Sequence, residues 1–286
     1  MPLEPLSPAA FAFIAQVEEI FATLLRWAAP REANVDAFGL GGKLLYAGEL
    51  DAPGRAFAVA ASIAGAAALA ASADPAAAKQ AMRDGAVDFL VNSLDEAQRI
   101  LKNQVRKRET VAVCVSLPPA SIETEMRARG VVPDLSFPRG FAGALAHWED
   151  LPGESSRGER PLAQSGDQNA PLEYLAASGE DAAERKEKTW LTWRVSDAPA
   201  LWLPRLDALA LDSLAPGEIA ARRWLERAPR YLGRLAQNAH ALRVTERQAG
   251  QILARFSAAA IAAPIEITLG PWGDSSHQTL SSPPAP

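Results

Sequence analysis

Two glycines, Gly48 and Gly54, lie where a short apolar strand is expected to meet a helix. A dinucleotide site needs glycines at such a junction, because they allow a tight turn and let the backbone approach the pyrophosphate. It also needs the first amide groups of the following helix to face the anion. Here residues 49–53 (Glu-Leu-Asp-Ala-Pro) separate the two glycines, without the G-x-G-x-x-G spacing. The loop alone therefore favours a nucleotide site no more than an ordinary strand-to-helix connection.

Other reactive side chains are few, since the chain has one cysteine and three histidines. Cys114 lies in the apolar run 111–117, which predicts a small buried residue rather than a nucleophile. The histidines, His147, His240 and His277, show no metal-ligand spacing. We predict no metal site and no internal disulfide, and we assign no catalytic residue.

Basic and aromatic residues cluster in three places. One basic group ends a predicted helix, where positive charge complements the helix dipole: Lys102, Arg106, Lys107 and Arg108. A second follows helical spacing if the helix continues past Pro229: Arg222, Arg223, Arg227, Arg230 and Arg234. An exposed charged face is favoured for both, while an anion or partner site stays open for the second. Four tryptophans are expected as core anchors, with the first two on opposite faces of a strand: Trp190, Trp193, Trp202 and Trp224.

Composition describes an ordinary globular chain of 286 residues, with 48% hydrophobic residues and a formal net charge of -5. This charge gives no general electrostatic reason to bind nucleic acid. The N-terminus lacks the basic flank of a secretory signal, and no run reaches the length of a membrane span, with residues 56–73 coming closest. We expect a cytoplasmic protein that binds neither nucleic acid nor membrane.

The elements that would position these residues alternate between strand and helix in the first half. We predict helices at 8–29, 55–66, 74–84, 93–107 and 121–129, and strands at 43–47, 67–72, 88–91, 110–116 and 131–135. Local signals support them, including Asp74-Pro75 as a helix start and a capping box from Ser93 to Glu96. Near-continuous apolar strands indicate an α/β fold, with a doubly wound, mostly parallel, Rossmann-like sheet and added C-terminal helices.

We divide the chain into five segments: an N-terminal helix at 1–37, a Rossmann-like domain at 38–148, a polar insertion at 149–187, a strand with helices at 188–269, and a tail at 270–286. The insertion and the tail are expected to be disordered, because they carry few large apolar groups. Within 188–269 we predict a strand at 188–195 and helices at 216–241 and 245–263, with Thr245 and Gln248 forming a capping box.

Residues 38–137 resemble urocanase (urocanate hydratase) over an ordered set of short motifs. They include Gly41-Gly42-Lys43-Leu44, Ala47-Gly48, the alanine-rich helix 54–66, Asp74-Pro75, Asp95-Glu96-Ala97 and Arg129-Gly130-Val131-Val132-Pro133-Asp134-Leu135. The resemblance implies a Rossmann-like domain that binds NAD, which in this family acts as an electrophile on the imidazole of urocanate. The cofactor-binding candidates that it implies are Gly48, Gly54, Ser72 and Asp74.

The departures from the family pattern are equally informative. Phe57 stands where the family has a glutamine, and Ser72 replaces its ribose-binding glutamate. Residues 136–140 replace the family's Asp-Gln-Thr-Ser-x-His-Asp segment. We therefore favour a degenerate homologue without hydratase activity that acts as a binding or scaffold module. The alternative is an active NAD-dependent, urocanate hydratase-like lyase, and either protein could form a homo-oligomer or bind a protein partner.

Overall fold

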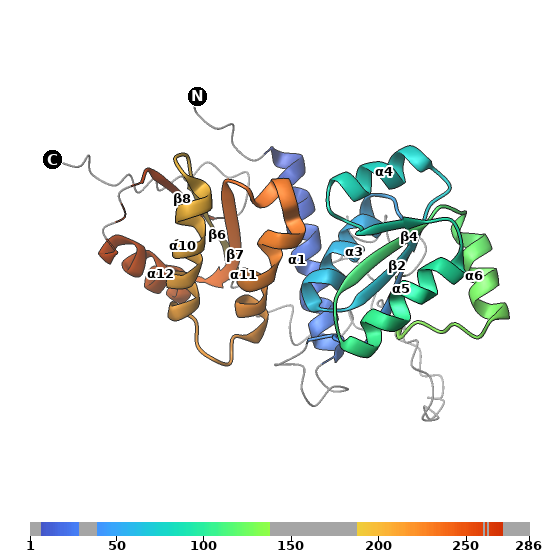
Figure 1. Cartoon of the computed structure of the whole chain (residues 1–286). Helices are drawn as coiled ribbons and strands as arrows, with labels where there is room; N and C mark the ends of the chain where they lie inside the picture. The colour runs from blue at the N-terminus through green and yellow to red at the C-terminus, as the bar shows by residue number, and fades with distance from the viewer. Residues whose placement is uncertain (1–6, 29–38, 138–187, 260, 262, 271–286) are drawn as a thin grey trace, which may run out of the picture. The chain divides into compact units, whose positions relative to one another are not determined.

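A computed structural model describes residues 7–28, 39–137, 188–259, 261 and 263–270 (Figure 1). The chain divides into two compact units. Arg26–Ala177 make up one, here called the parallel-sheet unit, and Met1–Leu25 together with Ser178–Pro286 make up the other, the antiparallel-sheet unit. The N-terminal helix thus groups with the C-terminal part of the chain. The predicted insertion at 149–187 and, apart from Gly270, the predicted tail lie outside the described residues.

The parallel-sheet unit alternates strands and helices as predicted. In chain order these are β1 (Leu44–Glu49), α3 (Ala52–Ala64), β2 (Ala67–Ala71), α4 (Pro75–Arg83), β3 (Phe89–Val91), α5 (Leu94–Lys107), β4 (Val111–Val115), α6 (Pro119–Ala128) and β5 (Leu135–Ser136). The strands form one parallel sheet in the order β3-β4-β2-β1-β5. The order changes direction at β1, and the doubly wound, Rossmann-like α/β fold is confirmed.

The two faces of this sheet carry side chains of different size. Alternate residues such as Leu69, Val113 and Val115 form one apolar core with residues of α5 and α6. The opposite face carries small residues, among them Ala68 and Ala112, and α3 packs against β1, β2 and β4. Because these side chains are short, the alanine-rich helix α3 lies close to the sheet.

Element boundaries differ from prediction where a side chain reorganises the backbone. Helix α3 begins at Ala52 rather than at 55, because Asp51 caps it. Strand β5 has only two residues rather than five, because the preceding segment first completes the end of α6: the Val131 N–H donates to the Met126 carbonyl.

Two aspartates attach the edge strands to their neighbours. Asp134 accepts a hydrogen bond from the Leu44 N–H at 2.8 Å, and its own N–H donates to the Leu44 carbonyl. Asp88 makes the same pair of bonds with Ala112 of β4. Asp134 belongs to a motif of the family resemblance, and its place here is structural.

The antiparallel-sheet unit contains α1 (Pro8–Ala28, of which residues up to Leu25 belong here), β6 (Lys188–Val195), α10 (Pro199–Ser213), α11 (Ile219–Leu232), the 3-10 helix η1 (Gly233–Ala236), β7 (Ala239–Thr245), α12 (Glu246–Ala258) and β8 (Ile265–Gly270). Its sheet has the order β7-β6-β8. The prediction of a helix to residue 241 was wrong, because Gly233, with φ 56°, ends the helical path and residues from Ala239 onward pair with β6. Strand β8 was also missed.

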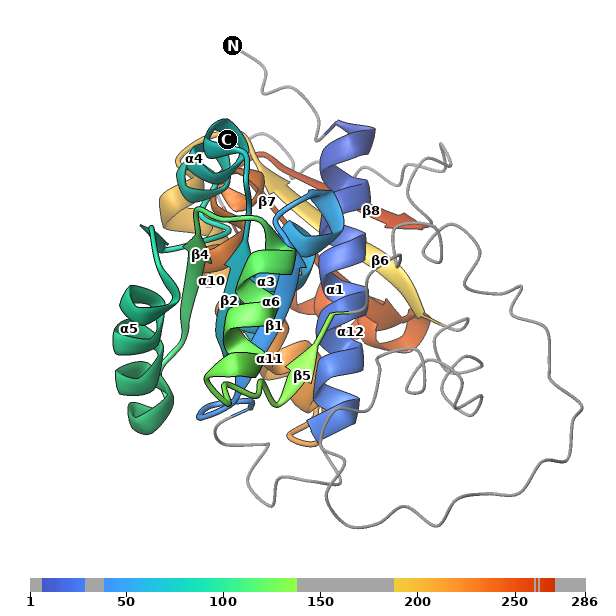
Figure 2. The same ribbon diagram turned by 90° about the vertical axis from the view of Figure 1, so that its right-hand side faces the viewer.

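The two faces of β6 hold different tryptophans, as predicted. Trp190 meets Phe11 of α1 at 5.1 Å between ring centroids, and Trp193 meets Phe256 of α12 at 5.7 Å. Figure 2 shows β6 running behind α1. Among the described helices, α1 is the one that is long and apolar enough to cross a membrane by length and composition. In the sequence, residues 56–73 were instead the run that came closest to a membrane span. Residues such as Phe11 and Phe21 are nevertheless buried in the protein.

Candidate functional site

The predicted cofactor residues lie at the carboxyl ends of β1 and β2, which are neighbours in the sheet. Glu49 at the end of β1 is in register with Ala71 at the end of β2. Gly48 lies at the end of β1 and Gly54 in the first turn of α3, while Ser72 and Asp74 lie in the adjacent loop between β2 and α4. The structure brings the four candidates to one edge of the sheet, where Rossmann-type folds bind their ligands.

Gly48 adopts a conformation that other residues avoid. Its φ is +72°, and the pairing of β1 with β2 shifts register between Tyr46 and Gly48, which indicates a bulge. No atom lies within 4 Å of a Cβ added at this position. Glycine is therefore required here by the backbone angle rather than by close approach of a neighbour.

The start of α3 is occupied by its own cap. The Asp51 carboxylate accepts a hydrogen bond from the Gly54 N–H at 2.9 Å, and the Arg55 N–H donates to the Asp51 carbonyl at 2.9 Å. Pro53, in the first turn, has no N–H to donate. Of residues 52–55 at the start of this helix, Ala52 is thus the one whose N–H is neither missing nor bound to Asp51. A phosphate placed here would meet a carboxylate instead of a set of amide donors.

Gly54 has a packing role. A Cβ on this residue would lie 1.9 Å from the Glu49 carbonyl oxygen and 3.3 Å from Asp51 Oδ1. The absence of a side chain thus lets the first turn of α3 rest on the end of β1. This matches the role of a Rossmann glycine in close helix–strand packing, not the role of admitting a pyrophosphate.

The cation nearest in sequence to this loop is also engaged. Arg55 Nη2 lies 2.6 Å from Asp84 Oδ2, so the guanidinium ties the start of α3 to the residue that follows α4. Its charge is balanced within the fold.

Ser72 and Asp74 serve the next helix. Ser72 is buried, and its hydroxyl accepts a hydrogen bond from the Asp74 N–H at 3.2 Å. The Asp74 carboxylate accepts from the Ala76 N–H at 2.8 Å and caps α4, as predicted. Both side chains therefore have hydrogen-bonding partners in the β2–α4 connection or in the first turn of α4.

An aromatic pair occupies the neighbouring position between α3 and β5. The rings of Phe57 and Phe137 lie 4.9 Å apart between centroids, and Phe57 is fully buried. The Phe137 N–H donates to the Tyr46 carbonyl, so this residue extends β5 alongside β1. Phe57 is the position at which the family resemblance predicts a glutamine. An apolar contact thus replaces a polar group.

Cys114, on β4, is buried as predicted. Burial, reinforced by the negative charge of Glu49, raises the pKa of its thiol from 9.0 to about 12. The thiol is therefore protonated near neutral pH and is a poor nucleophile.

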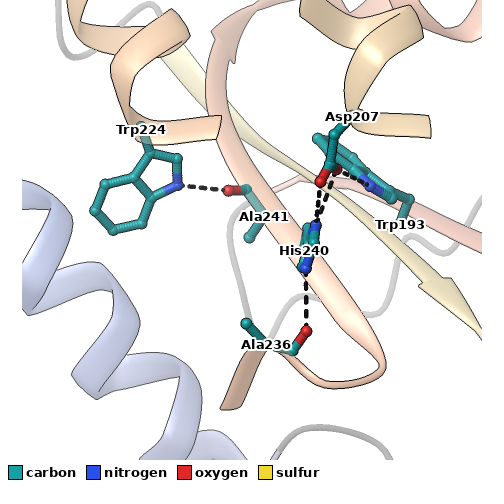
Figure 3. Close-up of polar contacts among 6 residues, drawn as sticks. All are labelled: Trp193, Asp207, Trp224, Ala236, His240 and Ala241. Atoms are coloured by element: carbon teal, nitrogen blue, oxygen red, sulfur yellow. Dashed lines mark hydrogen bonds and ion pairs between the residues drawn. The ribbon is translucent and has the colours of Figure 1, made fainter. Parts of the chain in front are cut away.

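A second polar cluster lies in the antiparallel-sheet unit (Figure 3). His240 Nδ1 lies 2.8 and 2.9 Å from the two carboxylate oxygens of Asp207, and Nε2 lies 3.0 Å from the Ala236 carbonyl oxygen. The Trp193 indole donates to Asp207 at 3.1 Å. A general base needs a ring nitrogen that faces a reacting group. Both ring nitrogens of His240 instead contact the chain, so the cluster connects α10, β6, β7 and η1.

Sequence reasoning missed Asp207, which lies 33 residues before its histidine. The available signal was an acidic residue inside the apolar, leucine-rich stretch 199–214. Such a residue is seldom buried without a partner.

The arginine series on α11 is divided among structural contacts. Arg222 donates to the Leu211 carbonyl at the end of α10, and Arg223 is buried. Arg227 and Arg230 lie against the Tyr231 ring. The series therefore does not form one exposed anion-binding stripe. No group of three or more His, Cys, Asp or Glu side chains that could hold a metal occurs in the described part of the chain.

Comparison with known proteins supports the resemblance read from the sequence. Residues 20–139 match the family model described as the urocanase Rossmann-like domain. No curated protein matches the chain significantly. The matched region, which is less than half of the chain, includes the whole parallel sheet and the four candidates Gly48, Gly54, Ser72 and Asp74. This region is therefore a divergent urocanase-like Rossmann domain.

Proposed function

We propose that this chain is a urocanase-like protein without hydratase activity that acts in the cytoplasm as a binding or scaffold module. One observation carries the proposal: the contact between buried Phe57 and half-buried Phe137 stands between α3 and β5, where the family resemblance predicts polar groups. Two phenylalanine rings offer neither hydrogen bonds nor proton transfer to a substrate.

The chemistry of the nearby side chains supports the same proposal. Hydration of urocanate needs groups that move protons at the reacting carbons and ring. Asp51 and Asp74 instead cap helices, and Ser72 is buried as an acceptor. The Cys114 thiol, with a pKa of about 12, holds its proton. Among the described residues at this edge, these side chains are committed to the fold.

The residues present also do not fit the pyrophosphate of NAD. The carboxylate of Asp51 lies at the start of α3, where a dinucleotide would place its own negative charge.

The direct test is an assay of urocanate hydration by the full chain, purified from a host that lacks its own urocanase. Urocanate loses its conjugated double bond on hydration, so the loss of its ultraviolet absorbance measures turnover. We expect no turnover above buffer, with or without added NAD, while an active urocanase in parallel consumes the substrate. NAD-dependent turnover would contradict the proposal and establish the lyase alternative.

The binding role is supported by an exposed edge strand. β3 ends the strand order of the parallel sheet, and Phe89 on it is 47% exposed. The strand has three residues, and the backbone groups at the edge of a sheet can pair with another chain. We expect Phe89→Ser to reduce self-association or partner capture, measured by light scattering on size-exclusion chromatography. Val132→Ser is the matched control, because Val132 is 69% exposed but lies outside the strands. Equal behaviour of the two variants would exclude this edge as the binding surface.

A further inference from the structure

In the helices that follow β1 and β2, the amide groups of the first turn are occupied or removed in the same way. Asp51 caps α3 and Asp74 caps α4, each through a carboxylate bound to an amide of the first turn. Each helix also carries a proline in that turn, Pro53 and Pro75. A proline removes one amide donor, and a carboxylate both occupies another and adds negative charge.

In the helices that follow β3 and β4, backbone amides at the start of the helix are also bound within the chain or replaced by proline. The Ser93 hydroxyl accepts a hydrogen bond from the Glu96 N–H, and the Glu96 carboxylate accepts from the Asn92 N–H at 2.9 Å. Helix α6 starts with Pro118 as its N-cap and Pro119 as its first residue, and the Ser121 N–H donates back to the Pro118 carbonyl. In parallel α/β folds all four of these starts lie at the edge where nucleotides bind.

We infer that this edge of the sheet is closed to nucleotide phosphates in general, including those of NAD. This goes beyond the loss of hydratase activity, because a protein that has lost its catalytic groups can still bind the cofactor. Phosphates are excluded because carboxylates of the chain already occupy the positive ends of helix dipoles, and because prolines lack the amide hydrogen that a phosphate would accept.

The test is isothermal titration of the full chain with NAD and, separately, with inorganic pyrophosphate as the smallest probe. The wild type is compared with the double variant Asp51→Ala/Pro53→Ala, which removes the carboxylate and restores an amide at the start of α3. Asp212→Ala is the matched control, since it removes one negative charge from an exposed position on α10. Circular dichroism verifies that each variant is folded.

We expect no saturable binding by the wild type or by Asp212→Ala at millimolar ligand. The double variant should bind pyrophosphate saturably, with a dissociation constant at least about tenfold below the highest concentration at which Asp212→Ala shows no binding, because the Asp51 carboxylate no longer repels the ligand at the start of α3. Saturable binding of either probe to the wild type overturns the inference, as does equal behaviour of the two variants. Binding without hydration of urocanate would overturn this inference alone and leave the proposed function in place.

Discussion

Replacement of Gly54 by alanine tests whether the start of α3 rests on the end of β1. The added Cβ would lie 1.9 Å from the Glu49 carbonyl oxygen, and a distance under 3.0 Å is essentially never seen for real Cβ atoms. The obstacle is backbone, so no side-chain rotation relieves it. Either β1 or the first turn of α3 must move by more than about 1 Å, and overpacking of this kind costs up to about 3 kcal/mol.

Helix propensity predicts the opposite sign. A glycine in a helix is less favourable than alanine by about 1 kcal/mol, so propensity alone would make Gly54→Ala stabilising. The balance of the two effects is a net loss of about 2 kcal/mol in the free energy of unfolding. That loss corresponds to roughly a thirtyfold change in the folding equilibrium constant.

Urea unfolding followed by far-ultraviolet circular dichroism measures this balance. Gly250→Ala is the matched control, because Gly250 lies within α12 and nothing is within 4 Å of its added Cβ. The control should gain about 0.5–1 kcal/mol. A Gly54→Ala protein as stable as the wild type, or more stable, would refute the claim that α3 touches β1 at this point.

Four further outcomes follow from the structure. Cys114 should resist thiol reagents in the native protein at about pH 8, because a pKa of about 12 leaves roughly one thiolate in ten thousand. It should react once urea unfolds the chain. Rapid labelling of the native protein would contradict the burial of this thiol. Because folding raises the pKa of the Cys114 thiol, the contribution of this thiol to the free energy of unfolding is complete below pH 9.0 and is lost as pH rises towards 12. Urea titrations across that range should show this loss in the wild type and not in Cys114→Ala. Asp207→Ala should lower the free energy of unfolding by about 3 kcal/mol, whereas Asp212→Ala on the same helix should lower it by less than about 0.5 kcal/mol. Similar values for the two variants would show that the contacts of the Asp207 carboxylate to His240 and Trp193 contribute little. Trp224→Phe should cost about 1–2 kcal/mol, since it removes a 2.8 Å hydrogen bond to a carbonyl of edge strand β7, and unchanged thermal stability would argue against that bond.

Local signals in the sequence predicted the parallel-sheet unit well. Asp74-Pro75 and Ser93 start their helices as predicted. In the other unit, Thr245 and Gln248 form the expected capping box. These interactions join residues at most four positions apart, so residue type and spacing are enough to reveal them. The Glu96 carboxylate reaches the Asn92 N–H rather than that of Ser93, a detail that depends on the local backbone path.

Strands that depend on a distant partner were harder to predict. β7 has the sequence Ala-His-Ala-Leu-Arg-Val-Thr, in which two alanines and a leucine favour a helix. Pairing with β6, some fifty residues earlier in the chain, makes it a strand. β6 itself was predictable, because its β-branched and aromatic residues favour a strand.

The sequence by itself thus determined the order of strands and helices in the parallel-sheet unit, because apolar periodicity and helix caps act over a few residues. Only the tertiary structure decided what the candidate site residues do. Gly54 faces a backbone carbonyl, Phe57 meets an aromatic ring eighty positions away, and His240 meets Asp207. Each of these contacts joins segments that become neighbours only when the strands and helices pack, so the spacing of residues along the chain cannot reveal it.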